Sequence, residues 1–219
     1  DLREDTDTKR TQVYTDQTGT SEWRNLKEAS LDTSFTAHFL VVAGGGGGGS
    51  EYAGGGGAGG YRTSFGTVSP ITISGTGSME SSLSLDAAID YTITVGPGGL
   101  GAVAASASGP GATGTNSVLS GTGITTITST GGGGGGNNSG TDGGSGGGAG
   151  CSGGTGVIGN AVTSPVVQGF NGGNRGSYSP KFPGGGGGGA AEVGESAPDQ
   201  NTSGDGGAGL ANAITVASG

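Results

Sequence analysis

Phe39-Leu40-Val41-Val42-Ala43 runs directly into six consecutive glycines at residues 44–49, and this junction decides the fold. The apolar stretch gains stability only in a buried place. A glycine loses more backbone entropy on ordering than any other residue, and it costs about 1 kcal/mol relative to alanine in a helix. The junction therefore predicts a short strand that continues into an extended glycine segment, which is not α-helical.

An ordered glycine run must find its hydrogen-bond partners outside itself. In the extended polyproline II conformation, with about three residues per turn, every N–H and C=O group points outward. Neighbouring chains must supply the partners, and glycine lets them approach closely enough. Further glycine-rich runs lie at residues 54–57, 131–136, 143–148, 184–189 and 204–209. The sequence thus predicts a bundle of polyglycine II helices connected by short strands.

The composition also fits a disordered chain. Glycine makes up 58 of 219 residues, and large apolar residues are few. Against disorder, the apolar residues are clustered in strand-like segments and the net charge is only -9. The chain has only 7 prolines and no strict Gly-X-Y period, which excludes a collagen triple helix. We expect an ordered chain and keep disorder as the alternative.

Charge and hydropathy limit the partners. The net charge of -9 comes without a basic cluster, which argues against nucleic-acid binding. No apolar run approaches the roughly 20 residues that span a bilayer, so we expect no membrane insertion. The single cysteine, Cys151, permits no internal disulfide.

Two domains are expected, a small β-hairpin module at residues 1–34 and a glycine-rich polyglycine II domain at residues 35–219. The module contains a single glycine, Gly19, and its hairpin is expected from residues 11–15 and 22–26. Alternation and β-branched residues predict further strands at residues 34–42, 61–65, 68–74, 82–85, 91–95, 116–119 and 124–128. The fold class is therefore mainly irregular and β, with short strands beside the glycine bundle.

Several strings occur in a specific order: Phe39-Leu-Val-Val-Ala followed by six glycines, Gly-Gly-Tyr61-Arg-Thr-Ser, Tyr91-Thr-Ile-Thr-Val-Gly-Pro-Gly-Gly, Ile127-Thr-Ser-Thr followed by six glycines, and Gly204-Asp-Gly-Gly-Ala-Gly-Leu. Together they resemble the glycine-rich domain of bacteriophage tail-fibre proteins, from Phe39 to the C-terminus. The segment from Arg3 to Trp23 is similar to short modules that precede such domains.

This resemblance implies a non-enzymatic component of the virion tail fibre, extracellular when mature and near the host-facing end. It implies a homotrimer together with other fibre proteins, and a host cell-surface glycan or outer-membrane protein as receptor. Host specificity would lie in loops between the glycine runs. No catalytic residue, cofactor or metal is implied. Because the chain stops at residues 213–219, where more glycine-rich sequence is expected, the domain is predicted to be truncated.

Aromatic and basic side chains in two segments are the candidate receptor contacts. Aromatic rings can stack on sugars or fill a protein pocket, and arginine adds directed hydrogen bonds. The candidates are Tyr61, Arg62 and Phe65 in the first segment, and Phe170, Arg175, Tyr178, Lys181 and Phe182 in the second. The alternative is that these residues cap the edges of the glycine layers.

No catalytic or metal site is expected from the remaining residues. The one histidine, His38, is expected within a strand, without a neighbouring nucleophile or second ligand. Asp142-Gly-Gly and Asp205-Gly-Gly are similar to calcium-binding glycine repeats, but no tandem nonapeptide follows and a turn is favoured. A secreted glycine-rich structural or ice-binding protein is the alternative function. RNA binding would need Arg-Gly-Gly repeats, which the chain lacks.

Overall fold

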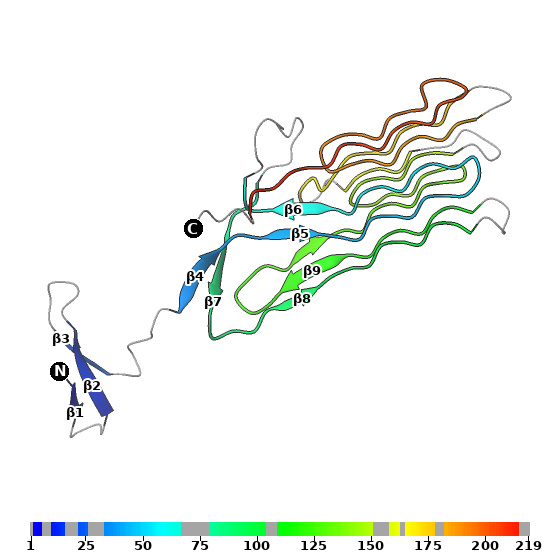
Figure 1. Cartoon of the computed structure of the whole chain (residues 1–219). Helices are drawn as coiled ribbons and strands as arrows, with labels where there is room; N and C mark the ends of the chain where they lie inside the picture. The colour runs from blue at the N-terminus through cyan, green and yellow to red at the C-terminus, as the bar shows by residue number, and fades with distance from the viewer. Residues whose placement is uncertain are drawn as a thin grey trace. The chain divides into compact units, whose positions relative to one another are not determined.

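A computed structural model of the chain describes residues 2–5, 10–15, 22–25, 33–66, 79–103, 109–150, 158–162, 165–177 and 182–214 (Figure 1). The chain forms two compact units. One comprises residues 1–35 with residues 86–88, and the other comprises residues 36–85 with residues 89–219. The second unit contains all of the glycine runs.

The N-terminal unit contains one antiparallel sheet. It is formed by β1 (Leu2–Asp5), β2 (Arg10–Thr15) and β3 (Glu22–Asn25), in that order. The register places Tyr14 opposite Trp23, which confirms the predicted hairpin of β2 and β3. The sequence does not predict β1, because Leu-Arg-Glu-Asp carries three charged residues and no apolar alternation. Pairing with β2, with Leu2 opposite Val13, makes this segment a strand.

The described part of the remaining chain contains short strands and no helix, hence none that is long and apolar enough to cross a membrane. β5 (Leu40–Val42) pairs with β6 (Tyr61–Thr63), and β9 (Ser117–Ser120) lies between β8 (Thr92–Thr94) and β10 (Ile127–Ser129). β4 (Ser34–Ala37) pairs with β7 (Leu83–Asp86). This is the mainly irregular and β fold that the sequence predicts. The strand predicted at residues 68–74 lies outside the described residues.

The strand predicted at residues 34–42 is interrupted. It divides into β4 and β5, which belong to different sheets, and His38 and Phe39 lie between them. Phe39 is buried, and its backbone N–H donates to the Ser64 hydroxyl at 2.8 Å instead of to a strand partner. In a continuous strand Phe35 would lie on the same face as Phe39, but Phe35 is exposed. Burial of Phe39, together with its backbone hydrogen bonds to Ser64, thus overrides the alternation.

The hydrogen bonds change their period where β5 and β6 continue into glycine. Beyond the strands, Ala43, Gly46 and Gly49 donate to the carbonyls of Gly60, Gly57 and Gly54 at 3.1, 2.8 and 3.2 Å. The bonded residues are therefore three apart along each segment, whereas those of an antiparallel strand pair recur every two residues. This spacing is the one that the polyglycine II prediction requires, since that conformation has about three residues per turn.

The segment at residues 131–136 shows the same period toward four neighbours. Its N–H groups donate to Gly44, Gly47, Ser145 and Gly148, and its carbonyls accept from Gly54, Gly57, Gly111 and Gly114. With each neighbour, two residues of this segment form hydrogen bonds, and these two residues are three positions apart. Their two partners on the neighbour are also three positions apart. A segment without side chains thereby satisfies its backbone groups on several sides.

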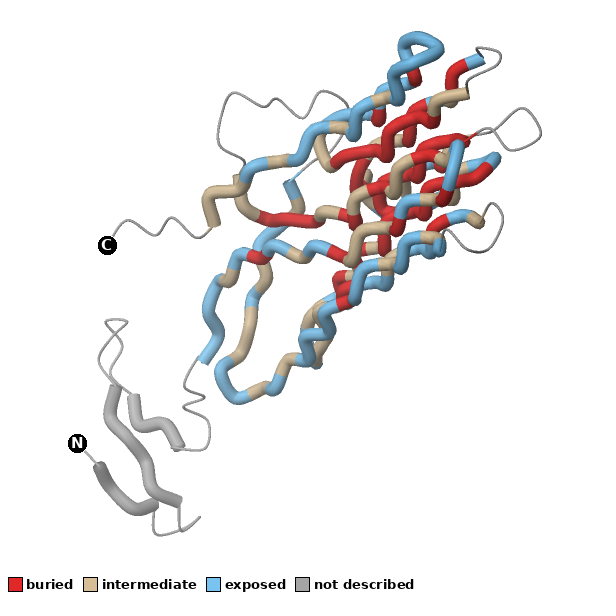
Figure 2. The backbone as a smooth tube through the Cα atoms, turned by 45° about the vertical axis from the view of Figure 1, so that its right-hand side comes forward, coloured by how far each residue is buried: buried red, intermediate tan, exposed pale blue. Residues whose placement is uncertain are grey.

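The core of this unit consists mainly of backbone. The buried apolar side chains that the structure describes are few, namely Phe39, Ala43, Ile127, Ala149 and Ala197. The buried residues in Figure 2 lie instead along the middle of the bundle, where residues 131–137, 143–150 and 184–189 run. A Cβ atom built on Gly133 would lie 1.9 Å from the Thr141 carbonyl oxygen. The absence of side chains is therefore what permits this packing.

Candidate functional site

The glycine segments run back and forth, so the bundle has two ends (Figure 1). One end carries β5, β6, β9 and β10, and we call it the strand end. The other carries the turns at residues 50–53, 137–140 and 196–203 together with the segment at residues 174–177, and we call it the tip end. Hydrogen bonds connect these segments, because Asn137 Nδ2 donates to the Ser50 carbonyl at 3.3 Å and the Ala197 N–H donates to the Asn174 carbonyl at 3.0 Å.

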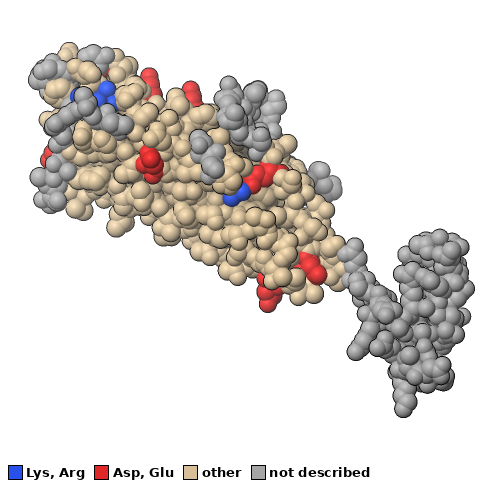
Figure 3. Space-filling view, turned by 180° about the vertical axis from the view of Figure 1, so that it is seen from behind, with Lys and Arg blue, Asp and Glu red and all other residues tan. Residues whose placement is uncertain are grey.

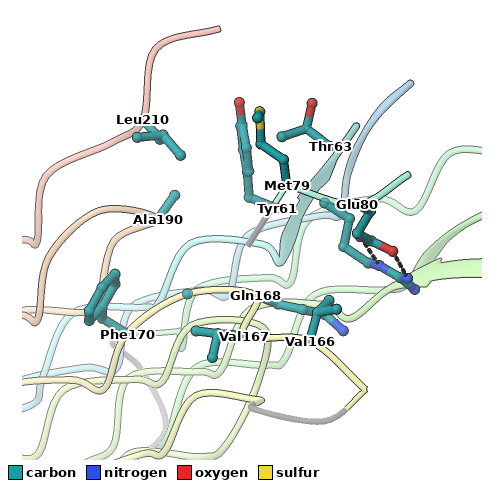
Figure 4. Close-up of a pocket in the computed structure, with 12 residues that line it drawn as sticks. Tyr61, Thr63, Met79, Glu80, Val166, Val167, Gln168, Phe170, Ala190 and Leu210 are labelled. Atoms are coloured by element: carbon teal, nitrogen blue, oxygen red, sulfur yellow. Dashed lines mark hydrogen bonds and ion pairs between the residues drawn. The ribbon is translucent and has the colours of Figure 1, made fainter. Parts of the chain in front are cut away.

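Three of the predicted contact residues meet in one cavity at the strand end. Tyr61 and Arg62 from β6 and Phe170 line it together with nine further residues, among them Met79 and Leu210 (Figure 4). The cavity has a volume of about 30 Å³, whereas ligand pockets commonly measure several hundred Å³. It is therefore too small to enclose a sugar ring.

Arg62 is held inside the protein by its own chain. Its side chain is 8% exposed, Nε donates to Glu80 Oε1 at 2.8 Å, and Nη2 forms an ion pair with Oε2 of the same carboxylate (Figure 4). Nη1 donates to the Thr128 carbonyl at 3.1 Å. Such a two-point pair fixes the guanidinium in one orientation. We therefore expect Arg62 to connect β6 with Glu80 and β10 rather than to reach a partner.

The polar edge of the cavity is also paired within the chain. Asn212 Nδ2 donates to the Tyr61 hydroxyl at 2.8 Å, and the same amide lies 3.1 Å from Thr63 Oγ1. The half-buried Phe65 ring packs edge to face against His38, with the ring centres 5.0 Å apart. His38 Nδ1 lies 3.1 Å from the Ser64 carbonyl oxygen and donates to it. These contacts give His38 and the aromatic residues structural partners.

The second predicted segment extends along the bundle instead of forming one loop. Phe170 lies at the strand end, where its N–H donates to the Gly189 carbonyl at 3.0 Å. Three residues later, Gly173 donates to the Gly186 carbonyl at 2.7 Å. The two segments therefore run antiparallel, and they carry the chain from the cavity to the tip end.

The other members of that segment follow at the tip end. Arg175 is half-buried in the segment at residues 174–177, and Phe182 is half-buried shortly before the third hexaglycine. Tyr178 and Lys181 lie outside the described residues. The structure thus brings Phe170 together with Tyr61 and separates both from Arg175.

The tip end presents an aromatic residue that the sequence reasoning did not select. Tyr52 is 62% exposed in the turn at residues 50–53. The preceding Glu51 has a φ of 61°, a left-handed conformation that L-residues adopt infrequently. Tyr52 is the one aromatic residue between the first two glycine runs, and this position could have identified it. Met79, Leu210 and Asn212 are distant in sequence from Tyr61, and nothing in the sequence indicates that they meet.

A carboxylate organises the last described turn of the tip end. Asp199 Oδ1 accepts the N–H groups of Asn201 and Thr202 at 2.7 and 2.9 Å, and Oδ2 accepts the Thr202 hydroxyl at 3.1 Å. The Asn201 N–H contributes most to lowering the pKa of Asp199 below its ordinary value; burial opposes this effect and the Thr202 hydrogen bonds add to it. Hydrogen bonds to the charged form have this direction of effect.

Acidification is expected to loosen this turn. Because the pKa of Asp199 is lower in the folded chain, the turn is stabilised above the unfolded pKa, and this contribution is lost as the pH falls through the folded pKa. NMR should show the amide shifts of Asn201 and Thr202 titrating together in acid. Asp199→Asn should abolish this titration, and amide shifts that titrate equally in the variant would contradict the assignment.

No metal-binding cluster is found in the part of the chain that the structure describes. Asp142 instead accepts the Asn160 N–H at 2.7 Å and lies 3.1 Å from the Asn160 side-chain amide. It therefore connects two segments, in keeping with the turn that the sequence favours. Cys151 lies outside the described residues.

The fold and its two ends define a class of protein in which hydrogen-bonded glycine segments form the core and short turns form the exposed end. The family profile of the glycine-rich domain matches residues 26–219. The chain therefore belongs to the glycine-rich domain family. No curated protein and no solved structure matches the chain.

Proposed function

We propose that the chain is a non-enzymatic structural component of a bacteriophage tail fibre and that its tip end contacts a receptor on the host cell. The phage context rests on the ordered strings from Phe39 to Leu210 that resemble tail-fibre domains. The observation that carries the contact role is the gathering of the turns at residues 50–53, 137–140 and 196–203, with the segment at residues 174–177, at one end of the bundle.

Packing restricts the bundle interior to glycine but leaves the turns free to vary. A Cβ atom on Gly135 would lie 1.9 Å from the Gly54 carbonyl oxygen, and one on Gly147 would lie 2.0 Å from that of Gly134. Side chains suited to recognition can therefore be carried mainly outside the bundle interior. A rigid scaffold with variable loops at one end is a common arrangement for binding.

The side chains at the tip end suit a glycan or a polar protein surface. The Tyr52 ring is exposed, as are the side chains of Asn138, Ser139 and Asn174. An aromatic ring can stack on a sugar face, and amide groups can both donate and accept hydrogen bonds. Charged side chains are sparse on the face of the molecule seen in Figure 3. The tip end itself also carries Glu51, Arg175 and Asp199, so recognition there can combine stacking and neutral hydrogen bonds with ion pairs.

The aromatic cavity at the strand end fits the alternative role of closing the bundle. Its volume of about 30 Å³ is far below that of an ordinary ligand pocket. Arg62 and Tyr61 are hydrogen-bonded to Glu80 and Asn212. We therefore assign the receptor contact to the tip end and a sealing role to Tyr61, Arg62 and Phe170.

Immunogold electron microscopy tests the virion assignment. Antibodies against the full chain are applied to the source culture, with particles and cells together. Label on tail fibres is the expected result, and label near their ends supports receptor contact. Label confined to cell surfaces or extracellular matrix would overturn the phage assignment and support a secreted structural protein.

A binding assay on host cells tests the tip end itself. Tyr52→Ala and Asn138→Ala together are expected to lower binding of the labelled full chain to cells about tenfold or more, since exposed aromatic anchors dominate interfaces. Met79→Ala is the matched control, because Met79 is 58% exposed and belongs to the strand end. Equal binding by the tip variant and the control would contradict the assignment.

A further inference from the structure

The segment at residues 96–103 forms one margin of the glycine bundle (Figure 1). Gly99 and Ala102 donate to the carbonyls of Gly45 and Gly48 at 2.8 and 2.9 Å. Residues 112 and 115 donate to the carbonyls of residues 100 and 97 on the other side. Among the described residues these are its two neighbouring segments, so one side of it faces solvent.

Residues that are three apart along this segment lie on the same side of it, and we call each such set a row. Gly96, Gly99 and Ala102 form the inward row, and a Cβ atom on Gly99 would lie 2.1 Å from the Ala112 carbonyl oxygen. The outward row contains Pro97, Leu100 and Val103, all exposed. Large side chains are therefore absent from the row that packs and present in the row that meets solvent.

The outward row is strongly apolar and continues onto β8. Leu100 and Val103 are 81% and 72% exposed, and Ile93 and Val95 are 73% and 79% exposed. A neighbouring groove of about 410 Å³ is lined by Leu40, Ile93 and Val95 among others. Four large apolar side chains exposed within residues 93–103 are uncommon on a chain that remains alone in water.

The opposite margin provides a comparison. Residues 204–209 also have an inward row, in which Cβ atoms on Gly204 and Gly207 would lie 1.9 and 2.1 Å from the carbonyl oxygens of Glu195 and Glu192. Their outward row, however, contains Asp205 and Ala208, both exposed. An apolar outward row is thus a property of the margin at residues 96–103 rather than of every edge segment.

Charge and hydrogen bonding indicate which molecule would cover this margin. Residues 91–141 contain no Asp, Glu, Lys or Arg, although the chain has a net charge of -9. Two copies of an acidic chain repel each other least where neither carries charge. The N–H groups of Gly98 and Gly101 donate no hydrogen bond to any residue that the structure describes. Another segment whose carbonyl groups recur every three residues can accept hydrogen bonds from both of these N–H groups.

We propose that the margin at residues 96–103 pairs with the same margin of a second copy of this chain. In a two-fold interface each surface meets itself, so the apolar rows cover each other and the N–H groups at residues 98 and 101 face carbonyls of the partner. Pairing with the margin at residues 204–209 would instead bury the Asp205 carboxylate against apolar side chains, which is costly. The interface therefore closes at two chains, in place of the homotrimer that the resemblance implies, and it does not depend on the phage assignment.

Sedimentation equilibrium of the full chain tests this pairing. The chain is expected to reach the mass of two copies as its concentration rises. Leu100→Glu should weaken self-association by roughly 100-fold, because each pair would bury two added carboxylates. Ala208→Glu, in the outward row of the opposite margin, is the matched control and should leave the association unchanged.

A second variant tests the backbone pairing without adding charge. Gly101→Pro removes one N–H, and a Cβ atom there meets its nearest atom at an ordinary 3.7 Å, so the fold should be retained. Association should weaken by roughly tenfold because two hydrogen bonds per pair are lost. Gly209→Pro, which has nothing within 4 Å of its Cβ, is the control. A one-chain mass at all concentrations, a three-chain mass, or equal effects of variants and controls would overturn the proposal.

Discussion

Gly133→Ala is expected to lower the free energy of unfolding by about 3 kcal/mol or more, at the upper end of the cost of overpacking a close-packed interior. The added Cβ would lie 1.9 Å from the Thr141 carbonyl oxygen and 2.8 Å from the Gly147 nitrogen. Both are backbone atoms, and Thr141 is itself hydrogen-bonded to Gly134 at 3.0 Å, so neither can turn aside as a flexible side chain could. Chemical denaturation of the full chain measures the loss.

Gly48→Ala is the matched control within the first hexaglycine. A Cβ atom on Gly48 would meet nothing within 4 Å, and the residue is exposed. Alanine there should stabilise the chain by about 0.4–1 kcal/mol, because it reduces the entropy of the unfolded state without native strain. Equal destabilisation by Gly133→Ala and Gly48→Ala would show that glycine is needed for backbone conformation rather than for close approach.

Glu80→Gln is expected to cost about 3 kcal/mol of folding stability, within the range for breaking a buried ion pair. The Arg62 and Glu80 side chains are 8% and 18% exposed, so the guanidinium would keep its charge with little access to water. One carboxylate oxygen would become an amide nitrogen, which cannot accept the second guanidinium hydrogen bond. Thermal unfolding measures the change.

The double variant Arg62→Met, Glu80→Leu separates the charge from the packing. With both charges removed, no ion is left unpaired in the interior, and the double variant should be more stable than Glu80→Gln alone. If the double variant were the less stable of the two, the pair would contribute through its hydrogen bond to the Thr128 carbonyl instead. Either result would leave the binding role of the tip end untouched.

The sequence predicts the local conformations well, because these depend on the residues themselves. Alternating residues predict β6, β8 and β9 close to their observed positions, and the polar interval between Thr15 and Glu22 predicts the hairpin of β2 and β3. β1 escapes prediction because a charged tetrapeptide becomes a strand only through its neighbour β2. The break at His38 and Phe39 escapes because Ser64, distant in sequence, hydrogen-bonds the backbone of Phe39, whose side chain is buried.

The candidate sites are predicted less completely. The sequence identifies Tyr61, Arg62 and Phe170 as unusual in glycine-rich surroundings, yet it does not reveal that Arg62 pairs with Glu80 18 residues away. Nor does it reveal that Asn212 reaches the Tyr61 hydroxyl from 151 residues away. Tyr52 is visible in the sequence as an isolated aromatic residue, but its exposure depends on where the turn at residues 50–53 ends in the bundle.

By itself, the sequence determined most of the strands, the glycine runs and where the chain must turn, since these follow from alternation, glycine entropy and the absence of side chains. Only the tertiary structure decided which runs are neighbours, which turns share an end and which row of residues 96–103 faces outward. The physical reason is that glycine runs are chemically alike. Their neighbours are chosen by turn lengths and by the few residues, such as Asn116 and Thr141, whose side chains hydrogen-bond to one run and not another.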